Sequence, residues 1–290
     1  QERNAQRSAD EAKAVLEFFQ NKVLAAARPA DQEGGLGIEA TIRAALDAGE
    51  PRIADSFSDQ PLVEAAIRDT LGLTYLYLGE AELAIPQHER SHELRESKLG
   101  PEHPDTLTSM GNLASAYKSV GKLDRAIPLY EQTLELSKAK LGPEHPDTLV
   151  SMNNLAVAYK SAGKLDQALP LLEQTLELVK AKLGLEHPNT LVLMNNLASA
   201  YESVGKPDQA LPLQEQTLEL MKAKLGPEHP HTLMSMNNLA YAYMSVGKLD
   251  QALVLREQTL ERMKTKLGPK HPHTLVSMNN LAVAYKSAGK

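Results

Sequence analysis

The amino-acid sequence predicts an all-α solenoid, in which a short helical unit is stacked on copies of itself. The string His-Pro-(Asp/Asn/His)-Thr-Leu begins at five positions, each 42 residues after the last: 103, 145, 187, 229 and 271. Residues 145–186 and 187–228 are identical at 33 of 42 positions. Apolar residues recur at helical spacing in each unit, and no unit shows the alternation of a strand. Contacts are therefore expected mainly between neighbouring units.

The segment before the array, residues 1–58, is predicted to be an N-terminal helical cap. Residues 10–28 form an amphipathic pattern with four apolar anchors: Val15, Phe18, Phe19 and Val23. Basic residues are too few on the polar side for a membrane-surface helix. We therefore expect this helix to shield the first repeat, and a partner-binding helix is the alternative. Gly34–Gly37 has neither the Lys-Ser/Thr ending nor the preceding strand of a nucleotide loop and is interpreted as a flexible linker.

The array itself is predicted to span residues 61–290. A degenerate first repeat covers residues 61–102, because Tyr75 and Gly79 lie 42 positions before Tyr117 and Gly121. The remaining repeats are four full copies and one partial copy: 103–144, 145–186, 187–228, 229–270 and 271–290. The partial copy contains only a first helix, from which we expect the parent array to continue.

Each repeat is predicted to contain two antiparallel helices, here called helix A and helix B. In the repeat 145–186, helix A runs from Asp147 to Ala162 and stops at Gly163, a natural helix stop. Helix B is predicted to start at Asp166 as its N-cap and to end near Gly184. Pro146 cannot continue the preceding helix and suits a first helical turn.

Composition and charge exclude several classes of protein. The chain has no Cys, which removes disulfide scaffolds, thiol nucleophiles, Cys-ligated zinc and iron–sulfur clusters. The net charge of −6 argues against nucleic acid as a partner, because phosphate binding needs a basic surface. No apolar run approaches the ~18 residues of a membrane span. We expect a cytoplasmic protein that binds neither nucleic acid nor membrane.

The repeat resembles a known family. The pattern Asn-Leu-Ala-x-x-Tyr-x-x-x-Gly-x-x-x-x-Ala from Asn154 to Ala168 resembles the tetratricopeptide (TPR) signature. The 42-residue period, with Asn-Asn-Leu-Ala and Leu-Gly-Pro-Glu-His-Pro-Asp-Thr, is similar to the kinesin-light-chain type. The resemblance implies a right-handed superhelix in which helix A lines the concave surface, and asparagines that hold the main chain of a bound peptide.

A second resemblance concerns the segments 11–29 and 34–53, which are similar to the region preceding such repeats in planctomycete-type bacterial serine/threonine kinases. The chain has no Gly-rich phosphate loop, HRD or DFG string, so a catalytic domain would lie outside it.

Helix A is predicted to present one stripe to the core and another to a ligand. At about 100° per residue, Met152, Leu155 and Tyr159 share the core side, while Val150, Asn154 and Val157 lie opposite. Asparagine recurs at one position of the second stripe, and its amide both donates and accepts hydrogen bonds. The candidate peptide-binding residues are Asn112, Asn154, Asn196, Asn238, Asn280, Val150, Val157, Lys160, Val192, Ser199, Glu202, Met234, Tyr241 and Met244.

Two features have alternative explanations. The repeated asparagines could simply record duplication, with side chains bonded to adjacent helices or to water. The repeated histidines, such as His145 and His187, suggest a metal site, but stacked helices lie ~10 Å apart, whereas ligands of one metal lie ~4 Å apart. We expect these histidines to shape the turns between helices and no metal to bind.

The sequence thus predicts a non-catalytic protein-interaction module that binds peptide or protein segments and needs no cofactor. Two alternatives stay open. The chain could be a regulatory or sensor region of a larger bacterial signalling protein, such as a serine/threonine kinase. It could also be a structural array that self-associates head to tail, since residues 1–102 carry 19 acidic and 11 basic side chains and residues 229–290 carry 3 and 8.

Overall fold

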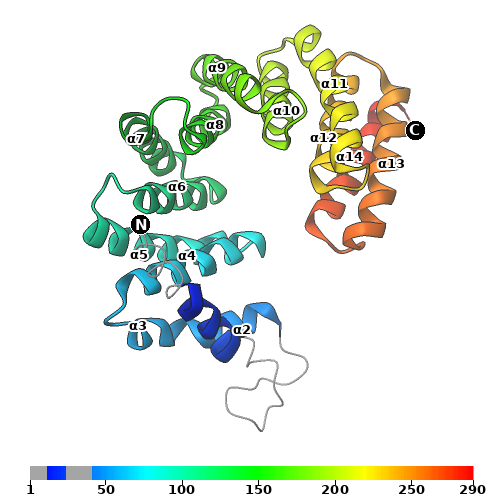
Figure 1. The fold of residues 1–290 in the computed structure, drawn as a ribbon. Helices are drawn as coiled ribbons and strands as arrows, with labels where there is room; N and C mark the ends of the chain where they lie inside the picture. The colour runs from blue at the N-terminus through cyan, green and yellow to red at the C-terminus, as the bar shows by residue number, and fades with distance from the viewer. Residues whose placement is uncertain (1–11, 24–40, 290) are drawn as a thin grey trace. The chain divides into compact units, whose positions relative to one another are not determined.

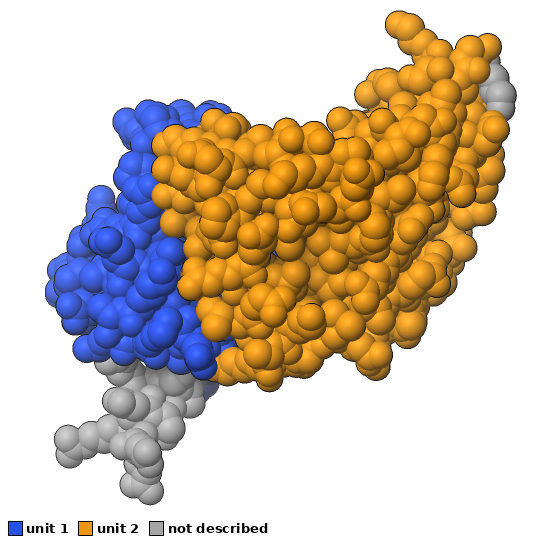
Figure 2. All heavy atoms as spheres, turned by 90° about the horizontal axis from the view of Figure 1, so that it is seen from above, with its two compact units in different colours: residues 1–151 blue, residues 152–290 orange. Residues whose placement is uncertain are grey.

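The computed structural model describes residues 12–23 and 41–289. The predicted linker Gly34–Gly37 lies outside the described residues. The chain divides into two compact units, residues 1–151 and 152–290 (Figure 2). Within the described residues every regular element is helical, and none is a strand.

The first unit begins with short helical elements. Residues 12–18 are α-helical and continue into the π-helical turn η1 (Phe19–Val23). After the undescribed segment follow α2 (Ile42–Gly49), the 3-10 turn η3 (Glu50–Arg52) and α3 (Ile53–Ser56). Leu46 and Ile53 are fully buried, and α3 packs against the first long helix. Tyr75 donates a hydrogen bond to Asp47 in α2, which further ties these elements to the array.

The repeats follow as alternating A and B helices (Figure 1). The first unit contains α4 (Pro61–Tyr77), α5 (Ala81–Leu99), α6 (Pro104–Ser119) and α7 (Leu123–Leu141). The boundary between the units falls inside α8 (Pro146–Ser161). The second unit continues with α9 (Leu165–Leu183), α10 (Pro188–Ser203), α11 (Pro207–Leu225), α12 (Pro230–Ser245), α13 (Leu249–Leu267) and α14 (Pro272–Ser287).

Each A helix from α6 onward starts with histidine followed by proline. In α10, His187 has extended backbone and its Nδ1 atom accepts a hydrogen bond from the main-chain N–H of Asn189 at 3.2 Å. Pro188 takes the first helical position, where a missing N–H costs nothing. The same bond forms at His103, His145, His229 and His271. The prediction that these histidines shape the turns is confirmed in this form: they are N-caps.

Glycine ends both helices of each repeat. Gly163 follows α8 with φ of +71°, and Gly184 follows α9 with φ of +86°. Residues other than glycine rarely adopt this backbone conformation with positive φ. Because both positions are glycine, the chain turns there with little strain. The stops predicted at these two residues are confirmed.

The predicted N-cap of helix B was wrong by two residues. Lys164, rather than Asp166, is the N-cap residue of α9, and its side chain makes no capping bond. Because Gly163 already completes the turn, the helix begins at Leu165, and Asp166 lies in the first turn, where its charge still favours the helix dipole. Helix A is shifted by one residue, since α8 runs from Pro146 to Ser161.

The core consists of small and aliphatic side chains between the two helix layers. In the second unit, α10 packs against α9 and α11, and α12 packs against α11 and α13. Met194 and Leu197 of α10 are buried, and so are their equivalents Met236 and Leu239 of α12. The core sides of α10 and α12 therefore match the predicted stripe, whereas in α14 the equivalent Met278 is 44% exposed. In the described ranges, no helix is both long and apolar enough to cross a membrane.

Candidate functional site

The candidate residues lie on one side of the A helices, at four positions of the repeat. We call this side the A-helix face: it comprises the residues equivalent to 150, 154, 157 and 160 in each repeat. In the second unit, α10 contributes Val192, Asn196, Ser199 and Glu202, and α12 contributes Met234, Asn238, Tyr241 and Met244. The same unit also holds Asn154, Val157 and Lys160 of α8 and Asn280 of α14, while Asn112 and Val150 belong to the first unit.

The A-helix face is accessible, and it is most apolar on α12. The side chains of Met234 and Tyr241 are 46% and 58% exposed, although both are large and hydrophobic. Asn238 and Met244 beside them are half-buried. Val150, at the start of α8, is also exposed. Exposed apolar groups next to partly buried amides are a usual composition for a binding surface.

Two asparagines of the A-helix face in the second unit are bonded to the preceding A helix. Asn196 donates a hydrogen bond to Oδ1 of Asn153 at 2.9 Å, and Asn238 donates to Oδ1 of Asn195 at 3.2 Å. Donor and acceptor are 43 residues apart in both cases. These bonds fit the alternative in which the asparagines serve neighbouring helices. They also hold each carboxamide in one orientation, and neither carboxamide has a further hydrogen-bond partner among the described residues.

The acceptors of these bonds were not predicted. The predicted residues include only the second asparagine of each Asn-Asn pair, although the first, as at Asn153 and Asn195, recurs in four of the five copies and is replaced by Gly111 in the other. Asn195 is buried, so its side chain needs an internal partner. The Asn-Asn pair is the sequence feature that could have indicated these acceptors, because adjacent residues on a helix point to different neighbours.

Two charged side chains of the face are partly withdrawn from water. Lys160 donates a hydrogen bond from Nζ to Oγ of Ser199 at 2.5 Å, and burial lowers the pKa of its amino group. Burial raises the pKa of the Glu202 carboxyl. Within the described residues neither group forms an ion pair. Both charges would therefore gain from a counter-charge supplied by a ligand.

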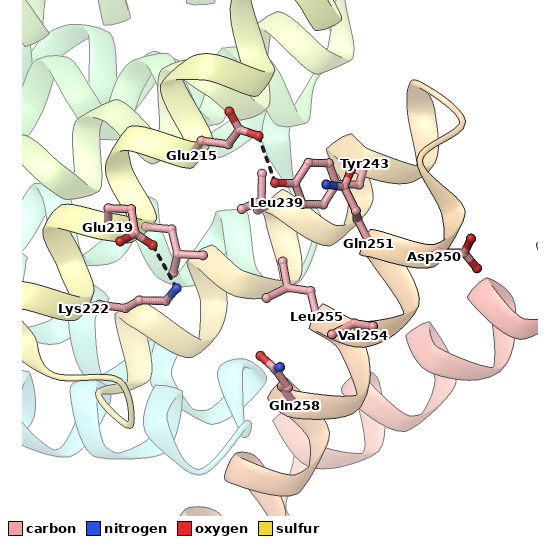
Figure 3. Close-up of a pocket in the computed structure, with 11 residues that line it drawn as sticks. Glu215, Glu219, Lys222, Leu239, Tyr243, Asp250, Gln251, Val254, Leu255 and Gln258 are labelled. Atoms are coloured by element: carbon pink, nitrogen blue, oxygen red, sulfur yellow. Dashed lines mark hydrogen bonds and ion pairs between the residues drawn. The ribbon is translucent and has the colours of Figure 1, made fainter.

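A cavity of about 450 Å³ lies between α11 and α13 (Figure 3). Leu239 and Tyr243 of α12 line it, and the Tyr243 hydroxyl donates a hydrogen bond to Glu215 of α11 at 2.9 Å. Lys222 and Glu219, which lie one turn apart on α11, form an ion pair at 3.0 Å. None of the candidate residues lines this cavity, and the repeat pattern of the sequence does not indicate it. Its acidic groups are already engaged within the protein.

Comparison with known proteins identifies the family. The family model for the tetratricopeptide repeat matches residues 63–139, 119–181, 161–223, 189–264 and 231–290. The chain belongs to the tetratricopeptide-repeat family.

Solved structures show the same fold. A putative kinesin light chain from Podosopora anserina with nearly identical TPR-like repeats is 34% identical, with a TM-score of 0.56, over 69% of this chain and 95% of that one. NprR in complex with its cognate peptide NprX is 15% identical, with a TM-score of 0.67, over 97% and 74%. Rap protein complexed with Competence and Sporulation Factor is 14% identical, with a TM-score of 0.65, over 94% and 73%. No curated protein sequence matches the chain.

Proposed function

We propose that this chain is a non-catalytic interaction module that binds an extended peptide or protein segment along its A-helix face. The observation that carries the proposal is the exposure of Met234 and Tyr241 beside the oriented carboxamide of Asn238. Such a surface offers apolar contact area and main-chain hydrogen bonds together. The fold supports the proposal, since two of the similar solved structures are complexes, NprR with its cognate peptide NprX and Rap protein with Competence and Sporulation Factor.

The asparagines and the apolar side chains of the A-helix face contribute differently to the free energy of binding. A hydrogen bond to a ligand contributes about 0.5–1.5 kcal/mol net, and ordering each ligand residue costs about 1–2 kcal/mol. The hydrogen bonds of the asparagines therefore fix the path of the peptide and roughly offset the cost of ordering it, so that removing them weakens binding although they add no net surplus. Affinity comes from apolar side chains such as Met234 and Tyr241, and we expect micromolar binding, about −8 kcal/mol.

The test is an array of immobilised random nonapeptides probed with the wild-type chain and with an Asn196→Ala/Asn238→Ala variant. The wild type should bind a subset of the peptides, and the variant should lose at least tenfold in affinity for them. Asn189→Ala is the matched control, because Asn189 is an exposed asparagine of the same helix outside the A-helix face. Circular dichroism should show equal helicity for all three proteins.

Unchanged binding by the double variant would contradict the proposal. An equal loss with Asn189→Ala would point to a general effect on the fold rather than to the A-helix face. The regulatory role in a larger signalling protein and head-to-tail self-association stay predictions.

A further inference from the structure

The A-helix face of the second unit changes its chemistry in steps from helix to helix. Lys160 of α8, Glu202 of α10 and Met244 of α12 occupy the same position of successive repeats, 42 residues apart. All three side chains are half-buried. Along the chain, one position therefore presents a cation, an anion and an apolar group in that order.

The two charges do not neutralise each other. Lys160 reaches toward α10, but its amino group bonds to Ser199, one helical turn from Glu202, and no ion pair joins the two charged groups within 4.0 Å. Removing a charge from water without a counter-charge is unfavourable. The fold thus keeps two opposite charges apart on one surface, each lacking an ionic partner among the described residues.

The A-helix face becomes markedly more apolar between α10 and α12. Met244 is accompanied on the A-helix face of α12 by Met234 and Tyr241, which are both more than two-fifths exposed. The equivalent residues of α10 are Val192 and Ser199, which are smaller and half-buried. A large apolar side chain of a ligand therefore finds more contact area at α12 than at α10.

The spacing of the steps sets the spacing in a ligand. Packed helices lie about 8–10 Å apart. A peptide in the polyproline II conformation advances about 3.1 Å per residue with three residues per turn, so one repeat corresponds to about three ligand residues, and every third side chain lies on the same side of the peptide. We propose that the ligand is a peptide in this extended polyproline II conformation, with an acidic residue, a basic residue three positions along, and a large apolar residue three positions beyond that. These side chains face Lys160, Glu202 and Met244, respectively. This order rests on the proposed function and adds the ligand's chemistry to it.

The test uses fluorescein-labelled nonapeptides and fluorescence anisotropy. The matched peptide is Ser-Asp-Ser-Ser-Lys-Ser-Ser-Leu-Ser, and its reversed sequence covers the opposite chain direction. In the two control peptides Asp and Lys exchange places, so composition and net charge are unchanged. At least one matched peptide should bind roughly tenfold more tightly than its control, because like charges then face each other in the control.

A charge-swapped protein makes the test reciprocal. The Lys160→Glu/Glu202→Lys variant should prefer the control peptides over the matched ones, whereas Lys138→Glu/Glu135→Lys, at exposed positions of α7, should keep the wild-type preference. Reversal of the preference supports the proposed order. Equal binding of matched and control peptides, lost in Asn196→Ala/Asn238→Ala, overturns the order and leaves the proposed function intact. Failure of every designed peptide to bind also overturns the order, and the random peptide array then decides the proposed function separately.

Discussion

The first repeat and the later ones use equivalent positions in different ways. Asp69 of α4 and Asn195 of α10 are separated by three repeat lengths and are both buried. Each accepts a hydrogen bond from the asparagine that lies 43 residues further along, Asn112 at 3.0 Å and Asn238 at 3.2 Å. The donor is constant, whereas the acceptor is a carboxylate in one repeat and an amide in the other.

The carboxylate requires partners that the amide does not. His88 donates from Nδ1 to Asp69 at 2.9 Å, and Arg95 forms an ion pair with Asp69 at 3.1 Å. His88 fits because residue 72 is glycine: a Cβ there would lie 2.5 Å from its ring. The equivalent of Gly72 in α10 is Ala198, which faces no such ring. The change of acceptor between the two repeats is thus accompanied by different residues at three other positions, those of Gly72, His88 and Arg95.

The largest expected effect is the loss of this acceptor in the first repeat. Asp69→Ala leaves Arg95, His88 and Asn112 without their shared partner, and breaking a buried charge pair costs about 3–5 kcal/mol. Asn195→Ala removes one neutral hydrogen bond and should cost about 1–2 kcal/mol. Urea unfolding of the two variants measures the difference. Equal losses would contradict the distinction between the two repeats.

A second effect of opposite sign is expected at Arg256 of α13, the equivalent of His88 four repeats later. Its guanidinium is buried, and its Nε and Nη1 atoms have no hydrogen-bond partner among the described residues. Replacing it by leucine, which occupies the same position at Leu172, should raise the free energy of unfolding by about 1–3 kcal/mol. Arg262→Leu, at a half-buried position of the same helix, should change stability little. A lower melting temperature for Arg256→Leu would show that the arginine has a partner in solution.

The pH dependence of stability should separate Asp69 from its neutral counterpart. Burial raises the pKa of Asp69, but the hydrogen bond from His88 and the charge of Arg95 outweigh it, so the folded pKa lies below the ordinary 3.8. The stabilisation is therefore complete above pH 3.8 and is lost as the pH falls through the lower folded value. Melting temperatures of the wild type and Asp69→Asn should differ by a constant amount above pH 5 and converge in acid. A constant difference down to pH 2 would contradict the lowered pKa.

The smallest expected effect concerns the helix caps, which are alike in all full repeats. His187→Ala removes the acceptor for the N–H of Asn189 and should cost about 0.5–1 kcal/mol. His187→Asn supplies another good N-cap and should recover most of the loss. Thermal unfolding measures both variants, and equal destabilisation by alanine and asparagine would refute the capping role.

The sequence predicted most of the fold because its local signals are explicit. Gly163, Gly184 and Pro146 mark the helix boundaries, and copies of one unit leave little choice of arrangement. The start of helix B was misplaced because the positive φ of Gly163 determines where α9 begins, and Asp166 is a good cap by residue type alone.

The candidate site was predictable only in part. The periodicity indicated which side of helix A faces outward, as the exposure of Met234 and Tyr241 illustrates. It did not indicate that Asn196 is already bonded to Asn153, since that bond depends on how two helices distant in sequence pack. The network around Asp69 was missed because the degenerate repeat has no second copy with which to compare it.

The most direct measurement follows the side-chain amides by NMR during titration with a binding peptide. Asn196 and Asn238 report on the A-helix face, whereas Gln251 and Gln258 line the cavity between α11 and α13. If the A-helix face is the binding surface, the amide resonances of Asn196 and Asn238 shift saturably while those of Gln251 and Gln258 stay unchanged. Shifts confined to Gln251 and Gln258 would contradict this account.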